Sequence, residues 1–412
     1  MMAENRSIPE IRFAGFTDAW EQRKFSDLVL IERGGSPRPI DDYITDAPDG
    51  LNWVKIGDAP EQGRYINKTA EKIKPEGLTK TRLVQPGDLI LSNSMSFGKP
   101  YIMGINGCIH DGWLLIRDTH SRFDLKFLCH MLGTDQMLDQ YRMFAAGSTV
   151  NNLNKELVGN TTVRLPSIEE QRVIGEYLES IDNLIALHQR KYDQLKNVKK
   201  SMLEKMFPRN GADVPEIRFA GFTGAWEQRK LSSIAEEVTR TAPESTAPVM
   251  MITANNGFIE QSDRYAFNNA GESLKKYILL EKGEMAYNHG ASKLRPYGSC
   301  FALTTAESAR IPFVYHCFSV GDNDSEFVSM ELNGSRVENQ LRRIVSSGAR
   351  MDGLLNISYE EYSSVELMLP SIQEQHVLAN YFRELDHLIT LHQCKYEKLK
   401  QIKKSMLEKM FV

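Results

Sequence analysis

The segment that comes nearest to a catalytic motif is 92–100, Ser-Asn-Ser-Met-Ser-Phe-Gly-Lys-Pro. A phosphate-binding loop needs a glycine five residues before its Gly-Lys pair and a hydroxyl residue directly after the lysine, because these groups hold the phosphates and a magnesium ion. This segment has neither. The sequence also lacks the N/D-P-P-Y/F motif of amino-methyltransferases. We therefore predict that the chain has no catalytic residues of its own.

Cysteine and histidine residues could in principle bind a metal ion. Cys108 with His110, and Cys129 with His130, are the candidates, but neither pair has the spacing that zinc sites use. We predict no metal site. The cysteines are odd in number and show no C-x-x-C spacing, which is typical of free thiols in a reducing compartment. They are Cys108, Cys129, Cys300, Cys317 and Cys394.

Composition limits the class of protein. The chain has 412 residues, of which 41% are hydrophobic and 25% are charged, enough for two or three domains. We expect a cytoplasmic protein, because no apolar run has the length of a membrane span and the N-terminus lacks a signal peptide's apolar core. The formal net charge of -4 excludes binding of nucleic acid through bulk charge alone. Local patches or partner subunits would have to supply phosphate contacts.

Two segments of the sequence occur twice. Pro9–Lys24 reads PEIRFAGFTDAWEQRK and returns with one change at Pro215–Lys230. Leu165–Phe207 and Leu369–Phe411 both begin LPSI and end KKSMLEKMF. Because the two repeats have nearly the same offset, the chain consists of two tandem half-units.

The longer repeat is predicted to form one long helix in each half. Ser167 with Glu170, and Ser371 with Glu374, have the spacing of capping boxes. Apolar residues then follow a period of 3.5, which is typical of a coiled coil, over a length of roughly 60 Å at 1.5 Å per residue. We expect the two helices to pair antiparallel about a two-fold axis, with His188 facing His392 as a polar register residue. The C-terminus should then lie near Pro9.

Between the repeats the halves differ. Short runs rich in Val, Ile, Tyr and Phe predict strands, and Leu125–Phe144 and Glu326–Ile344 each predict a helix. We predict an α+β fold in which two tandem mixed domains are joined by two long antiparallel coiled-coil helices, with a pseudo-two-fold, pseudo-circular arrangement. The expected boundaries are 1–164 for the first domain, 165–207 for the first helix, 208–215 for a linker, 216–368 for the second domain and 369–412 for the second helix.

The LPS-I-x-EQ helices ending in KKSMLEKMF, each half opened by FAGFT-x-AWEQRK, resemble the specificity subunit of type I restriction-modification systems. The segments Gly34–Pro39 and Asn52–Asp58 resemble a target recognition domain of that family. The resemblance implies that each variable domain binds one half of a split, asymmetric target in double-stranded DNA, and that the helices set the spacer between the half-sites.

The resemblance also implies partners. Two methyltransferase subunits would use S-adenosylmethionine to methylate adenine at N6, and motor-nuclease subunits would use ATP and magnesium. This chain would bind no cofactor itself.

The candidate DNA-binding residues are small polar or basic side chains on turns that follow predicted strands, where they could reach base edges or phosphates. In the first domain they are Arg33, Ser36, Arg38, Asn93, Ser94, Ser96, Lys99, Ser148, Asn151 and Asn152. In the second they are Asn255, Asn256, Asn288, His289, Ser292, Lys293, Arg295 and Arg350. For any one of them, a solvated turn or a capping role is as well supported.

Two other classes of protein fit parts of the sequence. One is a scaffold whose coiled coil joins two unlike ligand-binding domains. The other is a self-contained nuclease or methyltransferase, which the missing motifs disfavour. Sequence-specific retardation of DNA would separate the leading hypothesis from both.

Overall fold

The structure, a computed structural model, describes residues 8–93, 97–145, 153–209, 211–254, 257–263, 271–345 and 355–412. It divides into two units. Unit 1 contains Met1–Tyr192 and Thr390–Val412, and unit 2 contains Asp193–Ile389. These divisions fall inside the long helices, whereas the expected boundaries fell at their ends. The predicted domain boundaries, which treat each long helix as a segment of its own, describe a different division and stay a prediction.

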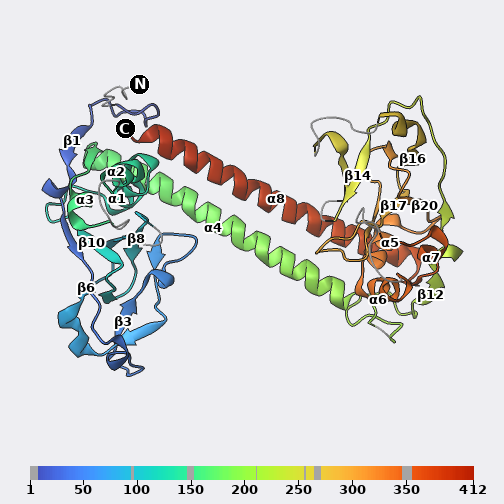
Figure 1. Ribbon diagram of the computed structural model, residues 1–412, viewed down its shortest axis with the longest axis horizontal. Coiled ribbons are helices and arrows are strands. Elements are labelled where there is room, and N and C mark those ends of the chain that lie inside the picture. Colours follow the sequence, from blue (N-terminus) through green and yellow to red (C-terminus); the bar gives the residue numbers. More distant parts are fainter. Residues whose placement is uncertain are drawn as a thin grey trace. The chain divides into compact units, whose positions relative to one another are not determined.

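Unit 1 contains two larger sheets and a short one (Figure 1). The order β2-β10-β7-β8-β4 forms a five-stranded sheet, β5-β3-β9-β6 forms a four-stranded sheet, and β1 pairs with β11. The strands are β1 (Glu21–Lys24), β2 (Leu30–Arg33), β3 (Leu51–Val54), β4 (Tyr65–Ile66), β5 (Glu71–Ile73), β6 (Arg82–Val84), β7 (Leu89–Ser92), β8 (Pro100–Met103), β9 (Gly107–Ile109), β10 (Trp113–Arg117) and β11 (Thr162–Leu165). Most are antiparallel, but β3 with β9 and β4 with β8 are parallel.

Unit 2 repeats part of this topology. Its four-stranded sheet has the order β13-β20-β17-β18, which corresponds to β2-β10-β7-β8, and β12 pairs with β21 as β1 pairs with β11. The strands are β12 (Glu227–Lys230), β13 (Glu236–Glu237), β14 (Met250–Thr253), β15 (Gly257–Glu260), β16 (Ile278–Glu281), β17 (Met285–Asn288), β18 (Ser299–Ala302), β19 (Ser308–Ile311), β20 (His316–Ser319) and β21 (Glu366–Leu369). The mixed α+β fold predicted from the sequence is confirmed.

Each predicted helix of the variable regions is in fact two helices. The first is α1 (Leu125–Leu132) and α2 (Asp135–Ala145), and the second is α5 (Ser325–Leu332) and α6 (Ser335–Ile344). The break in unit 1 lies at Gly133, which ends α1, and Thr134, whose hydroxyl accepts a hydrogen bond from the Met137 amide at 3.4 Å. Two short helices, α3 (Lys155–Gly159) and α7 (Tyr359–Ser363), were not predicted.

The long helices are α4 (Ile168–Lys205) and α8 (Ile372–Met410). Their antiparallel pairing is confirmed by contacts within each unit. In unit 1, His188 Nδ1 lies 2.9 Å from His392 Nδ1, and Lys403 forms an ion pair with Asp182. In unit 2, Lys199 Nζ lies 2.6 Å from Asp386 Oδ1. The register predicted from the heptad pattern, with His188 opposite His392, is therefore correct.

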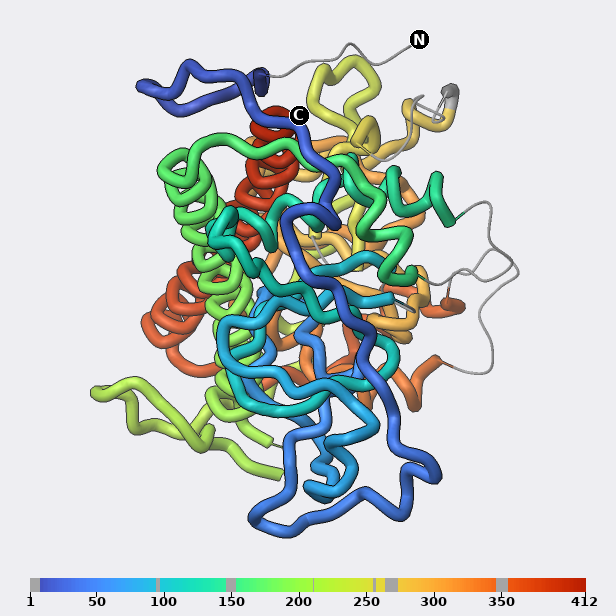
Figure 2. The backbone as a smooth tube through the Cα atoms, turned by 90° about the vertical axis from the view of Figure 1, so that its left-hand side faces the viewer, coloured from blue at the N-terminus to red at the C-terminus, as the bar shows by residue number. Residues whose placement is uncertain are grey.

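The shorter repeat holds the ends of the long helices. In unit 1 the Ile11 amide donates to the Lys409 carbonyl oxygen at 3.0 Å, and Trp20 packs edge-on against Phe411. Figure 2 shows the C-terminal end of α8 beside this N-terminal segment. In unit 2 the Ile217 amide donates to the Lys205 carbonyl oxygen at 2.9 Å. The same contact thus forms once in each unit, and the predicted proximity of the C-terminus to the segment that begins at Pro9 is confirmed.

The capping glutamates have a different role from the predicted one. The Glu170 backbone amide donates to the Ser167 hydroxyl at 3.3 Å, but the Glu170 carboxylate binds Arg12 at 2.6 and 2.7 Å. Arg218 binds Glu374 in the same bidentate way, with both distances 2.7 Å. Because both carboxylates are buried, a cationic partner stabilises them more than a backbone amide would.

Candidate nucleic-acid interface

Three turns of the first variable domain meet at Asp111. This residue lies in the turn His110–Gly112, between β9 and β10. Its backbone carbonyl accepts hydrogen bonds from Asn93 Nδ2 at 2.8 Å and from Arg33 Nε at 3.2 Å. Its carboxylate Oδ1 accepts from the Ser36 hydroxyl at 3.1 Å, and Oδ2 lies 3.8 Å from Arg38 Nη2. Four of the predicted site residues are therefore brought together by one residue that was not predicted.

Glycines let these turns approach one another. A Cβ atom on Gly34 would lie 2.2 Å from the His110 carbonyl oxygen, and one on Gly35 would lie 2.3 Å from the Lys80 carbonyl oxygen. Neither distance is compatible with a side chain. The Gly34 amide donates to the Trp113 carbonyl at 2.9 Å, so the chain is held against β10 at this point. The Gly-Gly pair thus places Ser36 and Arg38 beside Asp111.

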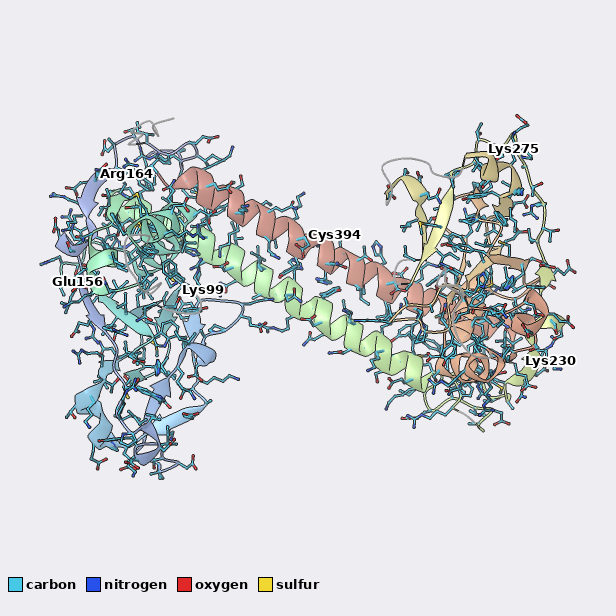
Figure 3. The ribbon with its side chains drawn as sticks, viewed as in Figure 1. Lys99, Glu156, Arg164, Lys230, Lys275 and Cys394 are labelled. Atoms are coloured by element: carbon cyan, nitrogen blue, oxygen red, sulfur yellow. The ribbon has the colours of Figure 1, made fainter. Side chains whose placement is uncertain are left out.

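Asn93 itself is buried and serves to position the turns. Its backbone amide donates to the Gly112 carbonyl at 2.9 Å, and its backbone carbonyl accepts from the Leu153 amide at 3.0 Å. Leu153 follows directly on the predicted loop that contains Asn151 and Asn152. Lys99, in contrast, is exposed at the start of β8, with its Nζ 5.2 Å from the centroid of the Tyr101 ring (Figure 3).

In the second domain, Asn288 ends β17 and His289 follows it, and the polar atoms of both side chains are bonded within the fold. Asn288 Nδ2 donates to the Ile252 carbonyl at 3.0 Å. His289 is buried, with Nδ1 2.9 Å from the Leu355 carbonyl oxygen and Nε2 2.7 Å from the Val314 carbonyl oxygen. Both ring nitrogens therefore face backbone acceptors, and the side chain has no free hydrogen-bonding edge.

The next turn contains two exposed candidates and one half-buried one. Ser292 and Lys293 are exposed, and the Ser292 hydroxyl accepts from the Arg295 amide at 3.0 Å. Arg295 Nη1 donates to the Asn333 carbonyl at 2.7 Å, and burial lowers the pKa of its guanidinium. In this arrangement Arg295 fixes the turn, while Ser292 and Lys293 face solvent.

The remaining predicted residues lie outside the part of the chain that the structure describes. They are Ser94, Ser96, Ser148, Asn151, Asn152, Asn255, Asn256 and Arg350.

The sequence did offer a signal for the missed Asp111. His110-Asp111-Gly112 is a polar turn directly before the apolar run that becomes β10, the same pattern that pointed to Asn93 after β7.

No metal site forms from the candidate ligands. Within the described ranges, no three His, Cys, Asp or Glu residues are grouped as metal ligands would be. Cys108 belongs to β9 and Cys129 to α1, in different apolar clusters. All five cysteines are free thiols, and burial raises the pKa of Cys108 and of Cys300 to about 12. Cys394, on α8, is exposed (Figure 3).

None of the helices in the described ranges has an apolar stretch long enough to cross a bilayer.

The fold and these turns define a protein in which a duplicated helical frame presents two unlike sets of polar loops. Comparison with known proteins shows what the chain is similar to. Residues 17–197 match the type I restriction modification DNA specificity domain. The chain is 22% identical to the putative type I restriction enzyme MjaX specificity subunit of Methanocaldococcus jannaschii, over 94% of this chain and 92% of that protein. It is 20% identical to the MjaVIII specificity subunit of the same organism, over 94% and 91%.

A solved structure shares the fold over almost the whole chain. The type I restriction-modification system S subunit from M. genitalium has a TM-score of 0.59 and 14% identity, covering 98% of this chain and 99% of that one. Residues 17–197 thus match the DNA specificity domain, the chain is similar over most of its length to specificity subunits of type I restriction enzymes, and it shares the fold of an S subunit.

Proposed function

We propose that this chain is the DNA-recognition subunit of a type I restriction-modification complex and that it reads a bipartite, asymmetric target. Each variable domain would bind one half-site in double-stranded DNA. The observation that carries this proposal is the contrast between the repeated frame and the unlike loops. The hydrogen bonds from the Ile11 and Ile217 amides to the ends of the long helices, called the clasp of each unit below, are the same in both units. The turns around Asp111 and His289, in contrast, differ in charge and polarity.

The residues proposed to contact DNA are those whose polar atoms face solvent. In the first domain these are Arg33, Arg38 and Lys99, and in the second Ser292 and Lys293. Lysine and arginine bind phosphates as well as base edges. They supply positive charge locally, although the chain as a whole has a net charge of -4. Asn93, His289 and Arg295 are proposed to position the loops instead.

The partners in this proposal are two methyltransferase subunits and motor-nuclease subunits. The methyltransferases would modify adenine at N6 with S-adenosylmethionine, and the motor-nuclease subunits would use ATP and magnesium. Equivalent leucines on the two helices support two copies of one partner. Leu187 on α4 is 42% exposed and Leu391 on α8 is 37% exposed, and they occupy matching positions of the repeat. Leu184 (43% exposed) and Leu388 (38% exposed) lie one turn earlier on the same helices and extend each apolar position, and contiguous exposed apolar patches mark docking sites. We propose that the complex is located in the cytoplasm, where it has access to the chromosome.

Mapping of methylated adenines tests this function. The full chain is expressed with its methyltransferase subunits in a host that lacks other adenine methylation, and the methylated positions in the host DNA are determined. We expect one motif with two unlike half-sites and a spacer of constant length.

Exchanging residues 25–164 for the corresponding domain of another specificity subunit provides the matched comparison. It should change one half-site and leave the other unchanged. Retardation of DNA by the purified complex without regard to sequence would contradict the proposal.

A further inference from the structure

One position is equivalent in the two variable domains but carries opposite chemistry. Strand pairing establishes the equivalence. Leu89 of β7 pairs with Ile116 of β10, and Met285 of β17 pairs with Phe318 of β20. Both β7 and β17 are entered through a glycine with positive φ, Gly87 at 92° and Gly283 at 89°. The residue five positions before Ile116 is Asp111, and the residue five positions before Phe318 is Phe313.

Hydrogen bonds around the two turns support the same alignment. The Leu153 amide donates to the Asn93 carbonyl at 3.0 Å, and the Leu355 amide donates to the His289 carbonyl at 2.9 Å. One residue beyond Asp111, the Gly112 carbonyl accepts from the Asn93 amide at 2.9 Å. One residue beyond Phe313, the Val314 carbonyl lies 2.7 Å from Nε2 of His289. Asn93, through its backbone amide, and His289, through its imidazole, therefore each contact the equivalent turn of their own domain.

The side chains at this position are accessible. Phe313 is 50% exposed. The Asp111 side chain is 31% exposed, and its Oδ2 lies 3.8 Å from Arg38 Nη2, beyond hydrogen-bond distance. Arg38 is 82% exposed and can move without loss of packing. Phe313 lies between Pro312 and Val314, and Val314 is also exposed, by 37%, so this turn presents an apolar surface where the first domain presents the Asp111 carboxylate.

We propose that position 111/313 determines the base preference of each half-site, with a guanine–cytosine pair read by Arg38 and Asp111 and a thymine methyl group read by Phe313. This inference rests on the proposed function.

The chemistry at each position favours this assignment. A carboxylate accepts hydrogen bonds from the cytosine amino group, and a guanidinium donates to the guanine edge. The cytosine amino group and the guanine oxygen that it bonds lie about 3 Å apart, the length of an N–H···O hydrogen bond. An acidic and a basic side chain that lie next to each other, as Asp111 and Arg38 do, can therefore contact both bases of one pair. An apolar ring makes favourable contact with the thymine C5-methyl group, which has no counterpart on cytosine.

The experiment first compares the methylation motifs of two variants, each expressed as the full chain with its methyltransferase subunits. Asp111→Asn should relax the guanine–cytosine requirement in one half-site by a factor on the order of tenfold, and leave the other half-site unchanged. Phe313→Ala should relax a thymine–adenine requirement in the other half-site only. Each variant thus serves as the folding control of the other.

Arg38→Gln provides a second test of the first domain, because so exposed a side chain contributes little to folding. It should relax the same base pair as Asp111→Asn. Asp41→Asn, the same chemical change at an exposed position nearby, should leave the motif unchanged.

The results separate this inference from the proposed function. If the wild-type chain directs no sequence-specific methylation, the proposed function fails. If it does, but Asp111→Asn and Phe313→Ala leave every base preference as before, the function stands and this inference is overturned.

Discussion

His188 and His392 meet ring to ring in the seam between α4 and α8, with their Nδ1 atoms 2.9 Å apart. One Nδ1 must carry a hydrogen and the other must accept it, so the pair is complete when both rings are neutral. Protonation of both rings would place two N–H groups against each other.

This pair predicts loss of stability in acid. Partial burial, His392 and Lys395 lower the pKa of His188 below its usual 6.5. The folded state therefore binds fewer protons than the unfolded state, so the stabilisation is complete above pH 6.5 and is lost as the pH falls below it. Replacing both residues by leucine should weaken this acid dependence, measured as the thermal midpoint at pH 5 and pH 8. His387→Leu, at an exposed position of α8, should retain it. An unchanged dependence in the double variant would argue against the pair as its source.

Arg12→Met should destabilise the clasp of unit 1. Removing the arginine leaves the Glu170 carboxylate buried without a partner, which costs about 3–5 kcal/mol in the free energy of unfolding. Arg23→Met removes the exposed Arg23–Glu21 pair and should cost less than about 1 kcal/mol. Chemical denaturation measures both. Equal costs for the two variants would mean that the buried pair has no special role.

Gly34→Ala should disturb recognition by the first domain. The new Cβ atom would meet the His110 carbonyl oxygen at 2.2 Å, so the turn must move away from Asp111 at a cost of about 1–3 kcal/mol. The half-site read by the first domain should be lost or relaxed in methylation mapping. Gly57→Ala, where nothing lies within 4 Å of the added atom, is the matched control. Retention of both half-sites by Gly34→Ala would contradict the role assigned to the glycine pair.

Glu331→Gln should stabilise unit 2 at neutral and higher pH. Burial raises the pKa of Glu331 to about 7, while its Oε1 accepts a hydrogen bond from the Met368 amide at 2.9 Å. The folded pKa lies above the unfolded one, so stability is greatest in acid and decreases as the pH rises from about 4.5 through 7. Glutamine keeps the acceptor without the charge, and the gain should be at most about 3 kcal/mol above pH 7. Glu244→Gln, at an exposed position, should change nothing. A Glu331→Gln variant that is less stable than wild type at pH 8 would show that the charge is needed.

Leu187→Glu and Leu391→Glu should each weaken assembly with one methyltransferase subunit and leave the stability of the free chain nearly unchanged. Both side chains are exposed on α4 and α8, so a charge there is tolerated in solution but is costly in an apolar interface. Sedimentation of the mixed subunits should show one bound partner for each single variant and none for the double variant. Val214→Glu, an equally exposed apolar residue in the linker, serves as the control. Full assembly by the double variant would place the partners elsewhere.

The frame of this protein could be predicted from the sequence. The duplication of Pro9–Lys24 implied two tandem half-units with the C-terminus near Pro9, and the heptad period implied the seam that pairs His188 with His392. The period of a helix and the identity of a repeat are properties of neighbouring residues, and they hold before any tertiary contact forms.

The recognition surface was decided by the tertiary structure. Asp111 stands far from Arg33 and Ser36 in the chain, and only the close approach allowed by Gly34 brings them together. The equivalence of Asp111 and Phe313 depends on strand pairing, since the two residues share no local sequence. The Glu170 carboxylate likewise bonds Arg12 rather than its own helix terminus, because folding places a buried cation beside it. Contacts between distant segments depend on how the strands pair and where glycines permit close approach, and neither can be read from residue spacing alone.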